Sequence, residues 1–86
     1  MLTEKECEFL NNRMHGTMIE AMGIRFLPTD DDAAVAEMPI CDATRQYFGI
    51  LHGGASLALA ETIAGAGSLH LIGYDQAKAV CGVQVS

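Results

Sequence analysis

The residues best suited to chemistry lie in one apolar stretch of the chain, from Gln46 to His70. Its single carboxylate, Glu61, is surrounded by alanines, glycines and leucines, and no Lys or Arg stands three or four positions away to pair with it. A carboxylate that water solvates poorly is a better general base or nucleophile. We therefore expect Glu61 to take part in a reaction rather than to lie on a solvated helix face.

A second chemical element, His52-Gly53-Gly54, comes before Glu61 at the predicted start of a helix. Unpaired N–H groups and the helix dipole favour negative charge at such an end, and a glycine there lets an oxygen atom approach the backbone closely. The segment could hold a phosphate or the oxyanion of an acyl-transfer intermediate. A nucleotide-binding phosphate loop is excluded because the GxxxxGK[ST] pattern is absent. The same dipole favours the neutral form of His52.

The spacing of these two elements has a consequence for assembly. Gly53 and Glu61 are eight residues apart, or roughly 12 Å along a helix that rises about 1.5 Å per residue. A base and an oxyanion donor must both lie about 3 Å from one reacting group, so Gly53 of one chain must meet Glu61 of another. Two antiparallel copies of the helix would achieve this along a face of small residues: Gly54, Ala58, Glu61, Gly65 and Ser68.

Hydrophobic periodicity, caps and turn residues divide the chain into the elements that must hold this stretch. In chain order we expect a helix over 2–16, a further helical turn over 17–23, a β-hairpin over 24–40, a loop over 41–51, a long helix over 53–71 and a strand over 78–86. Thr3 and Glu6 form a capping-box pattern, and Gly16 suits the end of the first helix. This order predicts one α+β domain over residues 1–86. Because one helix cannot cover a three-stranded sheet well, and the last strand stops in mid-pattern at Ser86, we expect the natural domain to be longer.

Composition narrows the classes of function. The formal net charge is −6, with 5 basic and 11 acidic residues, which argues against nucleic acid or an anionic membrane as the partner. Glu61 at the centre of the apolar stretch argues against a membrane span. The three cysteines show no CxxC pair, so we expect reduced thiols, no metal site and a cytoplasmic protein. A chain of 86 residues buries a small core, which favours self-association.

The segment "RQYFGILHGGASLALAETI" resembles the hotdog-fold acyl-CoA thioesterases, in the branch of the phenylacetate-pathway and dihydroxynaphthoyl-CoA thioesterases. The residues that carry the resemblance are Gln46, Phe48, Gly49, His52, Gly53, Gly54 and Glu61. "MIEAMGIRF", "AEMPI" and "VCGVQVS" also resemble strands of that family. The resemblance implies an antiparallel sheet wrapped around the long central helix, with the family's C-terminal strands absent from this chain.

The resemblance also implies roles for individual residues. The Gly53 N–H would polarise the thioester carbonyl, and Gln46 and His52 would help to position it. Glu61 of the partner subunit would act as the nucleophile or as a general base on water. The substrate would be an acyl-CoA, with an aromatic acyl group suggested by the branch, and the active form would be a dimer or a dimer of dimers. No cofactor is expected, since coenzyme A enters as part of the substrate.

Three further residues are assigned to substrate binding: Phe48, Gly54 and Gly65. Many relatives carry Ser or Thr at the position of Gly65, so the mechanism stays open between the two roles of Glu61. Arg45 and Lys78 could meet phosphates of coenzyme A, although solvated surface charges are the simpler interpretation. Two alternative functions remain: a hotdog dehydratase or hydratase acting on an acyl thioester, and a non-catalytic dimer that binds acyl-CoA.

Overall fold

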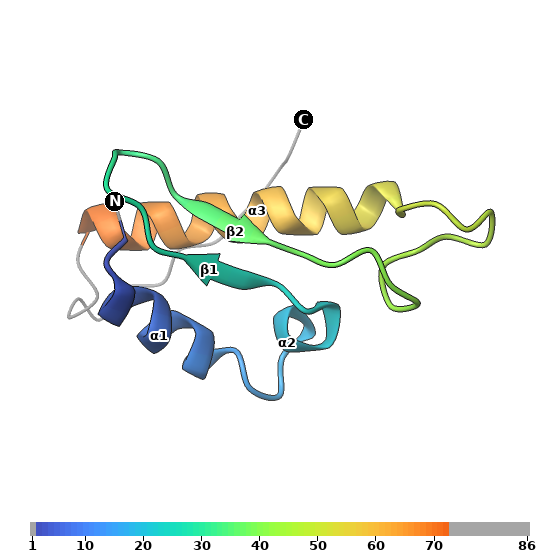
Figure 1. Ribbon diagram of the computed structural model, residues 1–86, viewed down its shortest axis with the longest axis horizontal. Helices are drawn as coiled ribbons and strands as arrows, with labels where there is room; N and C mark the ends of the chain where they lie inside the picture. Colours follow the sequence, from blue (N-terminus) through green and yellow to red (C-terminus); the bar gives the residue numbers. More distant parts are fainter. Residues whose placement is uncertain (1, 73–86) are drawn as a thin grey trace.

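The computed structural model describes residues 2–72, without the side chains of residues 69, 71 and 72. Two short helices lead into a two-stranded antiparallel sheet, and a long helix follows (Figure 1). The elements are α1 (Glu4–Arg13), α2 (Met18–Met22), β1 (Arg25–Leu27), β2 (Val35–Glu37) and α3 (Gly53–Ile72). This order confirms the predicted helix, helical turn, hairpin and long helix, while the strand predicted over 78–86 lies outside the described residues.

Helix α1 begins with the predicted capping box. The Thr3 hydroxyl accepts from the Glu6 N–H at 3.2 Å, and the Glu6 carboxylate accepts from the Thr3 N–H at 3.1 Å. The hydrogen bond from the Thr3 backbone holds the pKa of Glu6 below its ordinary value. The helix ends earlier than predicted, at Arg13 with Met14 as its cap, and Gly16 follows with a φ of 76°.

Helix α2 ends where the chain reverses into β1. Gly23 adopts a left-handed conformation with a φ of 75°, which a side chain would strain. Its N–H donates to the Glu20 carbonyl at 3.0 Å. A Cβ atom at this position would also lie 2.9 Å from the Pro39 ring, so two independent constraints require glycine here.

The hairpin places Phe26 at the centre of the core. Phe26 pairs with Ala36 across the sheet and is 1% exposed. The buried residues packed around it come from the first and last helices: Leu2, Cys7 and Leu10 from α1 and its lead-in, and Ala66 from α3. Because Ala66 is small, α3 can approach the hairpin closely, and Figure 1 shows the helix running along the strands.

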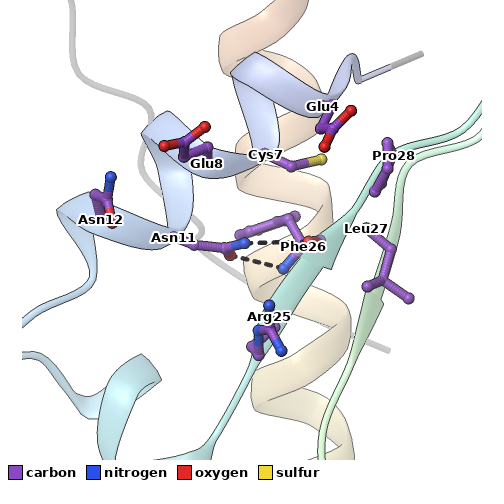
Figure 2. A pocket seen from close by; sticks show the side chains of 9 residues that line it. All are labelled: Glu4, Cys7, Glu8, Asn11, Asn12, Arg25, Phe26, Leu27 and Pro28. Atoms are coloured by element: carbon purple, nitrogen blue, oxygen red, sulfur yellow. Dashed lines mark hydrogen bonds between the residues drawn. The ribbon is translucent and has the colours of Figure 1, made fainter.

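The outer edge of β1 is closed by the N-terminal segment. The Asn11 side-chain amide accepts from the Phe26 N–H at 2.8 Å and donates to the Phe26 carbonyl at 3.2 Å, as a neighbouring strand would (Figure 2). The N–H groups on either side of Phe26 along this edge are also paired or absent. The Ile24 N–H donates to the Ile19 carbonyl, the Thr29 N–H donates to the Leu2 carbonyl, and Pro28 has no N–H. A strand edge of this kind is protected from pairing with another chain.

Candidate functional site

Thr44 anchors the segment that leads into α3. It is 1% exposed, its hydroxyl donates to the Pro39 carbonyl at 2.9 Å, and the same oxygen accepts from the Cys41 N–H at 2.9 Å. Its carbonyl accepts from the His52 N–H at 2.8 Å. Thr44 therefore fixes both ends of the segment, and His52 is placed at the start of the helix by this bond.

A tight turn lies between these anchor points. The segment predicted as a loop makes an antiparallel bridge between Arg45 and Leu51, and the Gln46 N–H donates to the Ile50 carbonyl at 2.8 Å. Gly49 completes the turn with a φ of 88°. The Gln46 side chain is half-buried, and its amide bonds to none of the residues described in 2–72.

Two aromatic rings occupy the tip of this turn. Tyr47 is 90% exposed and Phe48 is 74% exposed, and their ring centroids are 4.4 Å apart. Ile50, in the same turn, is exposed as well, as are Ile40 before the turn and Leu57 on the first turns of α3. Large exposed apolar groups that form a patch mark surfaces that a ligand or another chain covers.

The N–H groups at the start of α3 are almost all paired. The first four N–H groups of a helix have no partner within the helix ladder. Here the Gly54 N–H donates to the His52 ring, and the Ala55 and Ser56 N–H groups donate to the His52 carbonyl at 3.0 and 3.3 Å. Of these four groups, only the Gly53 N–H has no acceptor among the described residues. Gly53 is thus the open donor at this helix end, as an oxyanion site requires.

The His52 ring lies directly against the Gly54 backbone. Its Nδ1 atom accepts from the Gly54 N–H at 2.8 Å, and the ring is otherwise exposed. A Cβ atom at Gly54 would be 2.9 Å from Nδ1 and 3.0 Å from Cε1 of His52. At Gly53, in contrast, no described residue outside the adjoining backbone has an atom within 4 Å of the place where a side chain would begin.

Glu61 lies two helical turns further along α3. Its side chain is half-buried, and within the described part of the chain no group makes a hydrogen bond or an ion pair with it. Gly65, one turn later, is also half-buried and has open space beside it. Because α3 is continuous from Gly53 to Ile72, Glu61 stays roughly 12 Å from Gly53 within one chain.

One chain therefore brings together some of the predicted residues and not others. His52, Gly53 and Gly54 share the helix start, with Gln46 and Phe48 in the turn beside it, whereas Glu61 is remote along the helix. None of them lines the cavity of about 410 Å³ between α1 and β1 that Figure 2 shows.

Sequence reasoning missed Thr44 and the contact that Arg45 makes with Asp42. Thr44 looked like an ordinary loop residue, and only its position three residues after Cys41 suits the local side-chain-to-backbone bonds that it makes. Arg45 contacts the Asp42 carboxylate in the same turn. This pairing leaves less of its charge available for a phosphate group than the sequence suggested.

The described residues lack the features of two other classes of site. No helix there is long and apolar enough to cross a membrane. No group of three or more His, Cys, Asp or Glu side chains within residues 2–72 is arranged to hold a metal ion.

Comparison with known proteins identifies relatives of one kind. No protein-family model matches the chain. The ComA2 protein of Bacillus subtilis is 44% identical over 73 residues, which are 85% of this chain and 57% of that protein. The proofreading thioesterase EntH of Cronobacter sakazakii is 52% identical over 56 residues, 65% of this chain and 41% of that protein.

A solved structure extends the likeness to the fold. The crystal structure of a mutant of thioesterase PA1618 from Pseudomonas aeruginosa matches with a TM-score of 0.70 and 40% sequence identity, over 73% of this chain and 45% of that one. The chain spans about half the length of the relatives it matches. These likenesses confirm the expected fold class: in sequence and in structure the chain is similar to the hotdog-fold thioesterases, and its described residues form the helix–hairpin–helix portion of that α+β fold.

Proposed function

We propose that this protein hydrolyses an acyl-CoA thioester to the free acid and coenzyme A, in sites that two copies of the chain build together. The observation that carries the proposal is a half-buried carboxylate, Glu61, with no partner among the described residues, on the same helix as Gly53, whose N–H is the open donor at the start of that helix. The named thioesterases among the relatives support the same reaction class. Because the two groups are roughly 12 Å apart in one chain, the site needs Gly53 from one copy and Glu61 from the other.

The two groups divide the reaction between them. The Gly53 N–H donates to the thioester oxygen, where negative charge develops when the carbonyl carbon becomes tetrahedral. Glu61 either attacks that carbon, giving an acyl-enzyme anhydride that water later cleaves, or removes a proton from a water molecule that attacks instead. In both routes the C–S bond breaks and coenzyme A leaves as a thiolate that takes up a proton. Water supplies the added oxygen, the acyl group is released as a carboxylate, and Glu61 is regenerated.

The acyl group meets the protein near the aromatic turn in this proposal. Tyr47 and Phe48 are exposed and in contact with each other beside the helix start. Their rings offer a flat apolar surface, which suits a bulky or aromatic acyl group through ring stacking and burial. Two further residues complete the proposed contacts with the substrate. Gly65 leaves space beside Glu61, and the Gln46 amide, which bonds to none of the described residues, supplies a hydrogen-bond donor.

Subunit mixing tests the shared site directly. Glu61→Gln removes the carboxylate, and Gly53→Pro removes the N–H at the first helical position, where proline is tolerated. Each variant alone is expected to release no free thiol from benzoyl-CoA or decanoyl-CoA. After co-refolding in equal amounts, half of the dimers are mixed and each holds one intact site, so activity should return to about a quarter of the wild-type value.

The results distinguish a shared thioesterase site from the two alternative functions, a hydratase and a non-catalytic binding dimer. Mixed samples that stay inactive, while each variant dimerises normally, would overturn the shared site. Wild-type protein that hydrates crotonyl-CoA without releasing thiol would identify a hydratase instead. Binding of acyl-CoA with no turnover, unchanged in Glu61→Gln, would identify a non-catalytic binding dimer. Ser56→Ala, an exposed change on the first turn of α3, is the control variant and should behave as wild type.

A further inference from the structure

His52 occupies a position where other residues are usually preferred. It precedes the first residue of α3, and its Nδ1 atom accepts the Gly54 N–H at 2.8 Å, which is the bond of an N-cap side chain. Ser, Thr, Asp and Asn are the usual caps because each offers a short oxygen acceptor. A histidine that served only to cap the helix would add nothing that asparagine lacks, so its second ring nitrogen calls for an explanation.

The hydrogen bond determines which nitrogen carries the proton. An N–H donor faces Nδ1, so Nδ1 must be the unprotonated atom, and the proton of the neutral ring lies on Nε2. The ring can approach the backbone this closely because Gly54 has no Cβ, which would lie 2.9 Å from Nδ1. We propose that Gly54 is a positioning residue that fixes His52 in the Nε2–H tautomer, so that His52 meets the substrate as a hydrogen-bond donor and never as a base.

The catalytic consequence rests on the proposed thioesterase function, whereas the tautomer does not. The Nε2–H group of His52 adds a side-chain donor to the helix start, next in the chain to the open Gly53 N–H, and substrate oxygen is the acceptor that such donors suit. The neutral ring has no free lone pair left, because Nδ1 already accepts a bond and Nε2 carries the proton. Proton removal from water is therefore left to Glu61 or is not needed at all.

The tautomer can be measured without any substrate. Long-range proton–nitrogen NMR spectra of the whole protein in mildly alkaline buffer distinguish Nε2–H from Nδ1–H rings, and the spectrum of His52→Asn assigns the His52 signal by its loss. We expect a single Nε2–H form for His52 in the wild type. In Gly54→Ala the close contact forces the ring away, and its signal should move to a mixture of tautomers. An Nδ1–H form or a mixture in the wild type would overturn the inference, whatever the activity proves to be.

Two substitutions at His52 separate capping from donation. Asparagine places an acceptor where Nδ1 lies and keeps the cap, whereas glutamine places an N–H near the position of Nε2. We expect His52→Asn to retain the wild-type melting temperature and to lose roughly 100-fold in kcat, as removal of an oxyanion donor does, with little change in KM. His52→Gln should retain kcat within about 10-fold at a reduced melting temperature. Wild-type kcat in His52→Asn would show that the residue only caps the helix, and Ser56→Ala is the control.

Discussion

Replacing Asn11 by Ala removes the side chain that closes the outer edge of β1. Its amide makes two hydrogen bonds, at 2.8 and 3.2 Å, to the backbone of Phe26, a residue that is 1% exposed. A buried backbone group left without a partner costs about 1–3 kcal/mol, so the two groups together cost about 2–6 kcal/mol. Water can enter the adjacent cavity of about 410 Å³, which Asn11 itself lines, and partly replace the lost amide. We therefore expect a loss near the lower limit, about 2 kcal/mol.

Asn12 provides the matched control for this experiment. It is the next residue of α1, is exposed, and has no side-chain hydrogen bond to any residue that the structure describes. Both Asn→Ala changes raise helix propensity by a similar amount, several tenths of a kcal/mol, so the difference between the two variants isolates the bonds to Phe26. Urea unfolding followed by circular dichroism measures both free energies, and about 2 kcal/mol corresponds to a fall in Tm of roughly 8–16 °C.

The same variant should also change how the protein associates. An opened strand edge pairs with other chains, so Asn11→Ala is expected to form larger species as its concentration rises, as light scattering would detect. Asn11→Asp keeps the acceptor for the Phe26 N–H but places a charged oxygen against the Phe26 carbonyl, and it should be at least as destabilising as alanine. If Asn11→Ala is as stable as Asn12→Ala, the amide does not seal the edge and the reasoning is refuted.

Three further variants test other parts of the structure. Gly23→Ala should lower the unfolding free energy by about 1–3 kcal/mol, because a Cβ would strain a φ of 75° and press on the Pro39 ring, and urea denaturation with equal stability would contradict this. Glu6→Gln should be destabilising at neutral pH and harmless in acid, because a hydrogen bond from the N-cap backbone lowers the pKa of Glu6. The stability that the ionised carboxylate adds is present above the pKa that Glu6 has in the unfolded chain, and it is lost as pH falls through the pKa of the folded protein. Melting curves recorded at several pH values measure this loss. Replacing Ile50, which is 62% exposed, by Ser should weaken dimerisation roughly 5- to 30-fold in sedimentation experiments, since about 1–2 kcal/mol of apolar burial is lost. Met18→Ser, at a residue of α2 that is 61% exposed, is the control and should leave dimerisation unchanged.

Local sequence signals predicted much of this structure because the interactions behind them are local. The capping box of Thr3 and Glu6 spans three residues, and Gly23 ends α2 through its own backbone angles. The apolar run after Gly53 could form little other than a helix, and it does. The catalytic assignments for Glu61 and Gly53, in contrast, stay predictions, because they require a second copy of the chain.

The interactions that sequence could not reveal depend on how side chains pack in the folded chain. Asn11 and Phe26 are 15 residues apart, and an asparagine in a helix carries no sign that its amide will pair with a strand. Thr44 gave a similarly weak signal, since its hydroxyl looks like that of any loop residue until Pro39 and Cys41 fold around it. Such contacts depend on how elements pack, and local propensity and periodicity carry no information on packing partners.

The treatment of backbone N–H groups suggests why one of them is left open. Along this chain, side chains of several kinds close backbone donors that helix or sheet bonds do not: Thr3, Asn11, Thr44 and His52. The Gly53 N–H is the exception at its helix start, and it follows in the chain a turn whose Phe48 and Ile50 side chains are exposed. If association covers both this turn and the helix start, the open N–H would lose its water and remain unpaired, at a cost of about 1–3 kcal/mol. A group that accepts from the Gly53 N–H in the assembled protein removes this penalty. A thioester oxygen would do so best in the transition state, where its negative charge makes it a stronger acceptor, and tighter binding of the transition state accelerates the reaction.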